Sequence, residues 1–248
     1  MVISSKQKII RKLIILIKKF QVNFFVMQSK EVWRVIKKVT DEHLTYIEVD
    51  ALCELAQVVI ANENKHIDGI IVESGCALGG SAIVIASAKN KSRKFFIYDV
   101  FGMIPPPSER DEQDVHNRYM QIASGKSVGL GDKTYYGYEK NLYDKVTQNF
   151  KRFGFELREN NVCLVKGLYE DTLKIESPVA LAHIDCDWFD SVWVCLQRIE
   201  PYLISGGTLI IDDYYDWSGC KKAVDEYFKN KKNDYSFIHK SRLHIVKK

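Results

Sequence analysis

Short apolar runs alternate with longer segments of helical periodicity along most of this chain of 248 residues. Runs of strand length lie at residues 69–73, 94–99, 162–166, 179–187 and 207–213. Apolar residues recur at helical spacing over 43–64, 82–88, 139–153, 191–200 and 219–229. Residues 235–239 and 243–246 alternate between apolar and polar, like a closing pair of strands. This order predicts an α/β fold with a doubly wound, mostly parallel seven-stranded sheet and a terminal antiparallel hairpin.

Residues 101–138 interrupt this rhythm. They hold three consecutive prolines at 105–107, a charged stretch from Glu109 to Asp114, and glycines at 125, 129, 131 and 137 beside Tyr135, Tyr136 and Tyr138. A loop-rich insertion of this length is uncommon without a role, so we expect an active-site lid. A solvated disordered loop is the alternative that its composition allows.

The first 40 residues are expected to form a basic amphipathic helical arm, followed by a single domain over residues 41–248. Apolar positions of the arm recur at helical spacing, at Ile9, Leu13, Ile17, Phe20 and Phe24. Two roles stay open: a helix lying on a membrane surface, or an oligomerisation or docking arm whose basic face is solvated. Its uninterrupted apolar run, residues 13–17, is far too short to span a bilayer.

Charge is concentrated in the same region. Residues 1–38 contain ten basic residues and one acidic residue, a net charge of +9, which leaves −5 for the remainder of a chain whose total is +4. A mildly acidic globular part argues against nucleic acid as a partner. The six cysteines show no metal-finger spacing, which is typical of a reduced cytoplasmic protein. A basic arm on lipid would place it at the inner membrane surface.

Two of the apolar runs end in aspartates. Asp185 and Asp187 follow the run that begins at residue 179, and Asp212 and Asp213 follow the run that begins at residue 207. In an open α/β sheet, ligands bind beyond the carboxyl ends of the strands, where four carboxylates would repel one another without a cation. Such oxygen ligands select Mg²⁺, Mn²⁺ or Ca²⁺. Any one of these aspartates alone is as well explained as a helix cap or turn residue, and His183 inside the run is expected to be a core histidine.

A glycine-rich turn follows the run at 69–73, and a third strand-end carboxylate, Asp99, comes about 20 residues later. The turn has the pattern Glu73-Ser-Gly-x-x-x-Gly-Gly-Ser81, which matches neither the dinucleotide nor the phosphate-loop spacing. A nucleoside cofactor without a pyrophosphate is therefore favoured, with its ribose hydroxyls bound by Asp99.

Taken in order, these motifs resemble the macrocin O-methyltransferase family over about residues 45–230. The matching segments, besides the glycine-rich turn, are Asp99-Val-Phe-Gly102, Asn149-Phe-x-x-Phe-Gly154, Lys166-Gly-x-Tyr-x-Asp-Thr-Leu173, His183-Ile-Asp-Cys-Asp187, Ile211-Asp-Asp213 and Cys220-x-x-Ala-Val-Asp225. The resemblance implies a class I, Rossmann-like methyltransferase with N-terminal helices and a lid. It also implies S-adenosylmethionine and Mg²⁺ (or Mn²⁺) as cofactors, a sugar or glycosylated acceptor, and a homodimer.

The resemblance also implies roles for individual residues. Asp185, Asp212 and Asp213 would bind the metal, and Asp187 would be the general base. The cofactor would be bound by Glu73, Gly75, Gly79, Ser81, Asp99, Gly167 and Leu168.

This chain departs from the family pattern at three places, one of which is Trp188-Phe189, where the family has a tyrosine or phenylalanine after the Asp-x-Asp pair. The bulky residues usual in the turn are replaced by Cys76-Ala77-Leu78, and Val100 stands where the family has serine. The lid has no recognisable match in the family, so the identity of the acceptor molecule is not carried over from the resemblance. A catechol-like acceptor, a nucleotide-sugar or nicotinamide enzyme, and a non-catalytic binding module are the alternatives.

Overall fold

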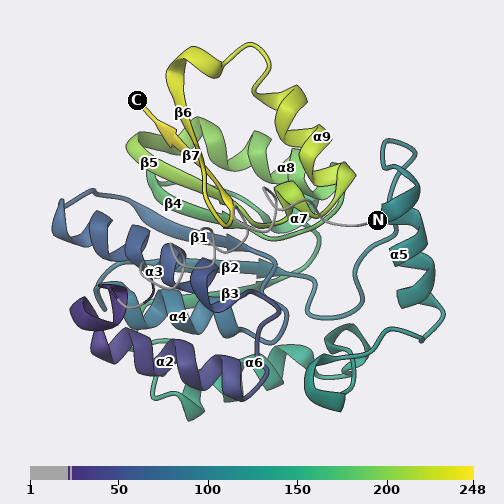
Figure 1. The fold of residues 1–248 in the computed structure, drawn as a ribbon, viewed down its shortest axis with the longest axis horizontal. Helices are drawn as coiled ribbons and strands as arrows, with labels where there is room; N and C mark the ends of the chain where they lie inside the picture. The colour runs from purple at the N-terminus through teal and green to yellow at the C-terminus, as the bar shows by residue number, and fades with distance from the viewer. Residues whose placement is uncertain (1–21, 23) are drawn as a thin grey trace, which may run out of the picture.

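The computed structural model describes residue 22 and residues 24–248, which contain a seven-stranded sheet flanked by helices on both faces (Figure 1). The strand order is β3-β2-β1-β4-β5-β7-β6. All pairings from β3 to β5 are parallel, and β7 is antiparallel to both of its neighbours. The strands are β1 (Ile70–Ser74), β2 (Phe95–Asp99), β3 (Val162–Lys166), β4 (Val179–Ile184), β5 (Leu203–Ile211), β6 (Tyr235–His239) and β7 (Leu243–Lys247). The predicted sheet with its closing antiparallel pair is confirmed.

Helices cover the two faces of the sheet in separate groups (Figure 1). One face carries α2 (Lys30–Asp41), α3 (Val49–Asn64), α4 (Gly80–Ala88) and α6 (Leu142–Arg152). The other face carries α7 (Tyr169–Thr172), α8 (Phe189–Ile199) and α9 (Ser218–Tyr227). The insertion holds α5 (Gln113–Ala123) to one side of the sheet.

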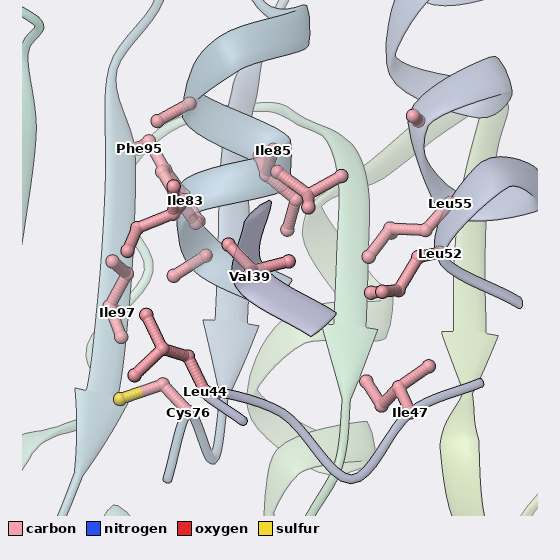
Figure 2. Packing of buried hydrophobic residues seen from close by; sticks show 14 of the residues in the cluster. Val39, Leu44, Ile47, Leu52, Leu55, Cys76, Ile83, Ile85, Phe95 and Ile97 are labelled. Atoms are coloured by element: carbon pink, nitrogen blue, oxygen red, sulfur yellow. The ribbon is translucent and has the colours of Figure 1, made fainter. Parts of the chain in front are cut away.

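Side chains of the central strands and of α4 form the middle of the core. All five residues of β1 and all six of β4 are buried, as expected for parallel strands covered on both faces. Figure 2 shows Ile83 of α4 beside Phe95 and Ile97 of β2, with Ile85 of α4 and Val39 of α2 in the same cluster. Burying a side chain of this size contributes about 1.5–3 kcal/mol, so α2, although it belongs to the stretch assigned to the arm, is held firmly by α4.

Two local predictions about helices differ from the structure. The helix expected from residue 43 begins only at Val49, because His43 has a positive φ of 55° and residues 44–48 run across the ends of the strands. Leu44 and Ile47 do enter the core from this non-helical segment, as Figure 2 shows, which explains the misleading helical spacing. The insertion, expected to be rich in loops, contains the eleven-residue helix α5.

Most of the proposed basic arm, including its apolar positions from Ile9 to Phe20, lies outside the described residues. Within the part of the chain that the structure describes, no helix combines the length and apolar character needed to cross a membrane.

The topology determines where a ligand can bind. The strand order reverses at β1 and β4, whose carboxyl ends carry the glycine-rich turn and the first aspartate pair, respectively. A crevice at this position is the usual ligand site of a doubly wound sheet.

Candidate active site

Gly75 follows β1 and lies against the end of β4, at the point where the strand order reverses. Its N–H donates a hydrogen bond to the Tyr98 carbonyl (2.9 Å), and the Asp185 N–H donates to the Ser74 carbonyl (2.9 Å). Gly75 has a φ of +88°, and a Cβ atom there would lie 1.8 Å from the Asp185 carbonyl oxygen. Only glycine allows the glycine-rich turn to approach the acidic strand end this closely.

Gly80, the first residue of α4, makes a second close approach. Its N–H donates to the Leu44 carbonyl (3.1 Å), and a Cβ atom would lie 2.5 Å from that oxygen. The close fit brings the segment 44–48 over the turn, where Thr45 and Tyr46 form part of a cavity wall. The preceding residue, Gly79, has a φ of +86° and begins the helix without a side-chain cap.

Asp99 ends β2 with its carboxylate held by two backbone amides. It accepts hydrogen bonds from the N–H groups of Cys76 (2.8 Å) and Phe101 (2.6 Å). Burial raises the pKa of Asp99, and the amide bonds offset part of that increase. The hydrogen bonds fix the carboxylate beside the glycine-rich turn, where a ribose-binding acid is expected. Gly167, which donates to the Asp99 carbonyl (3.0 Å), places the following Leu168 on the same wall.

A chain of charged side chains leads from the buried Glu73 of β1 through His183, Asp212 and Arg242 to the exposed Glu48. Glu73 Oε1 lies 2.9 Å from His183 Nδ1, and His183 Nε2 lies 3.6 Å from Asp212 Oδ1. Arg242 Nε donates to the same Asp212 oxygen (2.8 Å), and its Nη2 pairs with Glu48 (2.7 Å). Although burial lowers the pKa of His183, its two carboxylate partners raise it to about 10, so the ring is a cation.

His183 is therefore a buried core histidine, as the sequence predicts, and both of its ring nitrogens face carboxylates. One of its partners, Asp212, is an expected metal ligand, and the pair is supported by Arg242, a residue that no sequence motif singled out. Burial raises the pKa of Asp212, but His183 and Arg242 together hold it below its ordinary value.

Asp185, Asp187 and Asp213 form an acidic cluster beside Asp212. Burial, followed by repulsion from neighbouring carboxylates, raises the pKa of Asp185 and Asp213 well above the ordinary range. The same two effects raise the pKa of Asp187 to about 6. Asp187 has a left-handed backbone (φ 55°) and its N–H donates to Asp213 Oδ2 (3.1 Å). Strained residues of this kind persist where the surroundings hold them, often at functional sites.

The donor set fits a hard divalent cation. Ligand atoms of His183, Asp185 and Asp212 lie within 4.8 Å of one another. Because both nitrogens of His183 already face carboxylates, the atoms available to a metal are carboxylate oxygens, which suit Mg²⁺ or Mn²⁺. A cation among them would relieve the repulsion that raises the pKa values of the cluster.

Two cavities, of about 260 Å³ and 370 Å³, meet at this acidic cluster. Both are lined by Gly75, Asp99, Tyr136, Asp185, Asp187 and Trp188. The first cavity extends towards Val100, the prolines at 105–107 and Leu168, and the second towards Tyr46, Asp212 and Trp217. A two-part site of this form can hold a cofactor and a second molecule with their reacting groups near Asp187.

The insertion contributes side chains that the sequence analysis did not identify. Arg118 of α5 and the rings of Tyr135 and Tyr136 line the second cavity. The Arg118 guanidinium lies 5.7 Å from the Tyr135 ring centre and exerts a charge effect that lowers the pKa of Asp187. Their role depends on how the insertion docks, which no local sequence pattern indicates.

The structure thus brings eight of the eleven expected site residues to the cavity walls. These are Gly75, Ser81, Asp99, Leu168, Asp185, Asp187, Asp212 and Asp213. The other three, Glu73, Gly79 and Gly167, do not line either cavity. Glu73 is fully buried and contacts the site through His183.

Comparison with known proteins points to one family. A model of the macrocin-O-methyltransferase (TylF) family matches residues 40–240 of this chain. Demethyldecarbamoylnovobiocin O-methyltransferase of Streptomyces niveus is 27% identical over 189 residues, covering 74% of this chain and 67% of that protein. A tetracenomycin-C rhamnosyl 4'-O-methyltransferase of Streptomyces olivaceus is 28% identical over 186 residues, covering 72% of this chain and 64% of that protein. The chain thus spans about two thirds of the length of these relatives.

Solved structures share the fold. The O-methyltransferase NovP matches with a TM-score of 0.67 and 24% identity, covering 83% of this chain and 81% of that one. The calicheamicin methyltransferase CalS11 matches with a TM-score of 0.60 and 14% identity, covering 88% and 92% of the two chains. The chain therefore has the class I methyltransferase fold, as the resemblance implied.

Proposed function

The chain belongs to the macrocin O-methyltransferase family, and we propose that it transfers a methyl group to a hydroxyl of a sugar or of a glycosylated small molecule. As a member of that family it is an S-adenosylmethionine-dependent O-methyltransferase. The Streptomyces olivaceus relative is named for methylating a rhamnosyl group, which supports a sugar hydroxyl as acceptor. The observation that carries the proposal is the junction of two cavities at Asp99, Asp185 and Asp187.

The first cavity suits S-adenosylmethionine. Gly75 provides a wall without a side chain, Asp99 provides a fixed carboxylate for ribose hydroxyls, and Leu168 provides an apolar surface for the adenine. Ser81, which lines the second cavity, and Glu73, Gly79 and Gly167, which line neither, complete the proposed cofactor site by shaping the turn between the two cavities. The sulfonium group would then point towards the shared wall of the two cavities.

Asp185, Asp212 and Asp213 would hold Mg²⁺ or Mn²⁺ at the acidic cluster. When bound, such an ion lowers the pKa of a hydroxyl group and fixes its oxygen. Arg242 and His183 orient the Asp212 carboxylate through Oδ1, which leaves Oδ2 free of both partners. Groups that orient a ligand in this way support metal affinity.

Asp187 is the proposed general base. It lies on both cavity walls, and its pKa of about 6 is higher than that of an ordinary aspartate. A carboxylate with a raised pKa accepts a proton more readily while it remains ionised near neutral pH. The acceptor oxygen would lose its proton to Asp187 and attack the methyl carbon held in line with the sulfur.

Aromatic groups of the second cavity favour a sugar as acceptor. Tyr46, Tyr136 and Trp217 supply flat apolar surfaces, and Arg118 supplies donors for hydroxyl oxygens. Tyr136 and Trp188 line both cavities and would exclude water from the reacting atoms.

Calorimetric titration with S-adenosylmethionine, with and without Mg²⁺, tests the cofactor site. Micromolar binding by the wild type that is lost in Asp99→Ala is expected. Incubation with sugars, glycosides and catechols, followed by mass spectrometry, then tests the acceptor. Methylation of catechols alone would reject the sugar proposal, and binding of nucleotide sugars without S-adenosylmethionine binding would reject the methyltransferase site.

A homodimer, and contact of the basic arm with an anionic membrane surface, are also proposed. The arm's net charge of +9 over residues 1–38 supports the second. Sedimentation with anionic vesicles, comparing the full chain with one lacking residues 1–28, tests it, and light scattering tests the dimer. Equal partition of the two chains would reject membrane contact.

A further inference from the structure

Helices α8 and α9 begin without a cap of their own. Their N-cap residues are Trp188 and Trp217, and neither makes a side-chain capping bond. A helix start normally carries a serine, threonine, aspartate or asparagine that bonds a free N–H group. In this protein the missing acceptors come from the insertion.

Asp111 supplies the acceptor for α8. Its Oδ1 accepts a hydrogen bond from the Phe189 N–H (2.8 Å), and its Oδ2 accepts one from the Ser108 N–H (3.0 Å). The same carboxylate also lies against α9, because a Cβ atom on Gly219 would be 2.1 Å from Asp111 Oδ1. Asp111 is buried between the starts of the two helices, and only glycine at 219 leaves room for it.

Asp114 supplies the acceptors for α9. Its Oδ2 accepts from the Ser218 N–H (3.0 Å), and its Oδ1 accepts from the Ser218 hydroxyl (2.5 Å). Further contacts fix the same segment. The Trp188 indole donates to the Pro105 carbonyl (3.0 Å), and Arg110 pairs with Glu226 of α9 (2.8 Å).

These contacts hold the two helix starts that follow the acidic cluster along the chain. Phe189 comes two residues after Asp187, and Ser218 comes five residues after Asp213. The segments that carry the cluster, a loop after β4 and the 3-10 helix η4 (Asp212–Tyr215) with the two residues after it, therefore each end at a helix start held by the insertion.

We infer that Asp111 and Asp114 are positioning residues that hold the segments 185–188 and 212–217 at the spacing the metal site requires. Neither aspartate lies among the expected metal ligands, and each acts through a backbone amide of the helix that follows a ligand segment. The acidic cluster is therefore correctly positioned only when the insertion is docked against the starts of α8 and α9. This inference rests on the metal site of the proposed function.

The test is calorimetric titration of Mg²⁺ into the full chain bearing Asp111→Ala, Asp114→Ala or both. Glu112→Gln is the matched control, since Glu112 lies between them, is exposed, and caps no helix by its side chain. Each alanine variant is expected to weaken Mg²⁺ binding about tenfold, a loss usual for groups that orient metal ligands. Asp111→Asn, which keeps one acceptor oxygen, is expected to recover part of that loss. Asp111 lines the first cavity, so the comparison with S-adenosylmethionine, measured without metal, rests on Asp114→Ala, whose affinity for that cofactor should change less than twofold. All values for Glu112→Gln should also change less than twofold.

Two results would overturn the inference. Unchanged Mg²⁺ affinity in the folded double variant would show that the caps do not position the cluster. Equal losses of Mg²⁺ and S-adenosylmethionine affinity in Asp114→Ala, with a lowered melting temperature, would show a general structural role only. Failure of the wild type itself to bind Mg²⁺ would instead reject the metal site of the proposed function, so the two failures are distinguishable.

Discussion

Replacement of Gly75 by alanine should disrupt both the cofactor turn and the acidic strand end. The new Cβ atom would lie 1.8 Å from the Asp185 carbonyl oxygen, whereas side-chain carbons stay at least 3.0 Å from such neighbours. The two backbones must therefore separate by roughly an ångström. Both are held there by the hydrogen bonds of Gly75 to Tyr98 and of Asp185 to Ser74.

The cost has two parts. A positive φ costs a residue with a side chain about 1–2 kcal/mol, and overpacking adds about 1–3 kcal/mol. Gly154 provides the control, because its φ is +81° and a Cβ atom there meets nothing within 4 Å. Gly154→Ala should lower the free energy of unfolding by about 1–2 kcal/mol, the cost of the positive φ alone. Gly75→Ala should lower it by about 2–5 kcal/mol, the sum of both costs.

Urea unfolding and S-adenosylmethionine titration of both variants measure this. Gly75→Ala should weaken cofactor binding by more than tenfold, since displacements of an ångström are costly in such sites, while Gly154→Ala should bind as the wild type does. Equal stability and equal cofactor affinity of the two variants would refute the close-approach argument.

Three further predictions concern other parts of the molecule. Burial, together with Lys240 and His183, lowers the pKa of His244 to about 4, so the unfolded chain takes up a proton near pH 6.5 that the folded protein refuses. The contribution of the neutral His244 ring to the free energy of unfolding is complete above about pH 6.5 and is lost as the pH falls towards 4. His244→Leu should therefore remove up to about 3 kcal/mol of the fall in unfolding free energy between pH 7 and 4, measured by urea titration, and an unchanged pH dependence would exclude His244 as its source. Chelation of divalent cations should abolish methyl transfer in the wild type, with recovery on adding Mg²⁺; full activity in excess chelator would argue against the metal. Arg118→Gln should raise the KM for the acceptor several-fold at constant affinity for S-adenosylmethionine, in steady-state assays, and an unchanged KM would remove Arg118 from acceptor binding.

The sequence predicts the strands well because a short apolar or alternating run of neighbouring residues is enough to indicate each one. The bounds expected for β3 and β6 coincide with the structure, since both are short runs with clear ends. Helix α5 was missed because it buries only Val115 and Ile122, too few to give an apolar stripe. The start of α3 was misplaced because Leu44 and Ile47 reach the core from an extended segment.

The same distinction applies to the site. Asp99, Asp185 and Asp212 sit at strand ends, and a parallel sheet brings such ends together whatever the details of packing. Arg242 reaches Asp212 only because β7 pairs with β5, and Arg118 reaches the cavity only because the insertion docks. Contacts that depend on long-range pairing leave no periodic signal in the sequence.

The position of β7 has a consequence for how the chain folds. β7 follows β6 along the chain but lies between β5 and β6 in the sheet, so β5 keeps an open edge until the β6–β7 hairpin docks. That edge includes Leu209, Ile210 and Ile211, the kind of apolar strand that recruits other chains. Arg242, which steadies Asp212, arrives with the same hairpin. A molecule whose β6–β7 hairpin has not docked would therefore both expose an aggregation-prone edge and lack Arg242 beside Asp212, and docking of the hairpin corrects both.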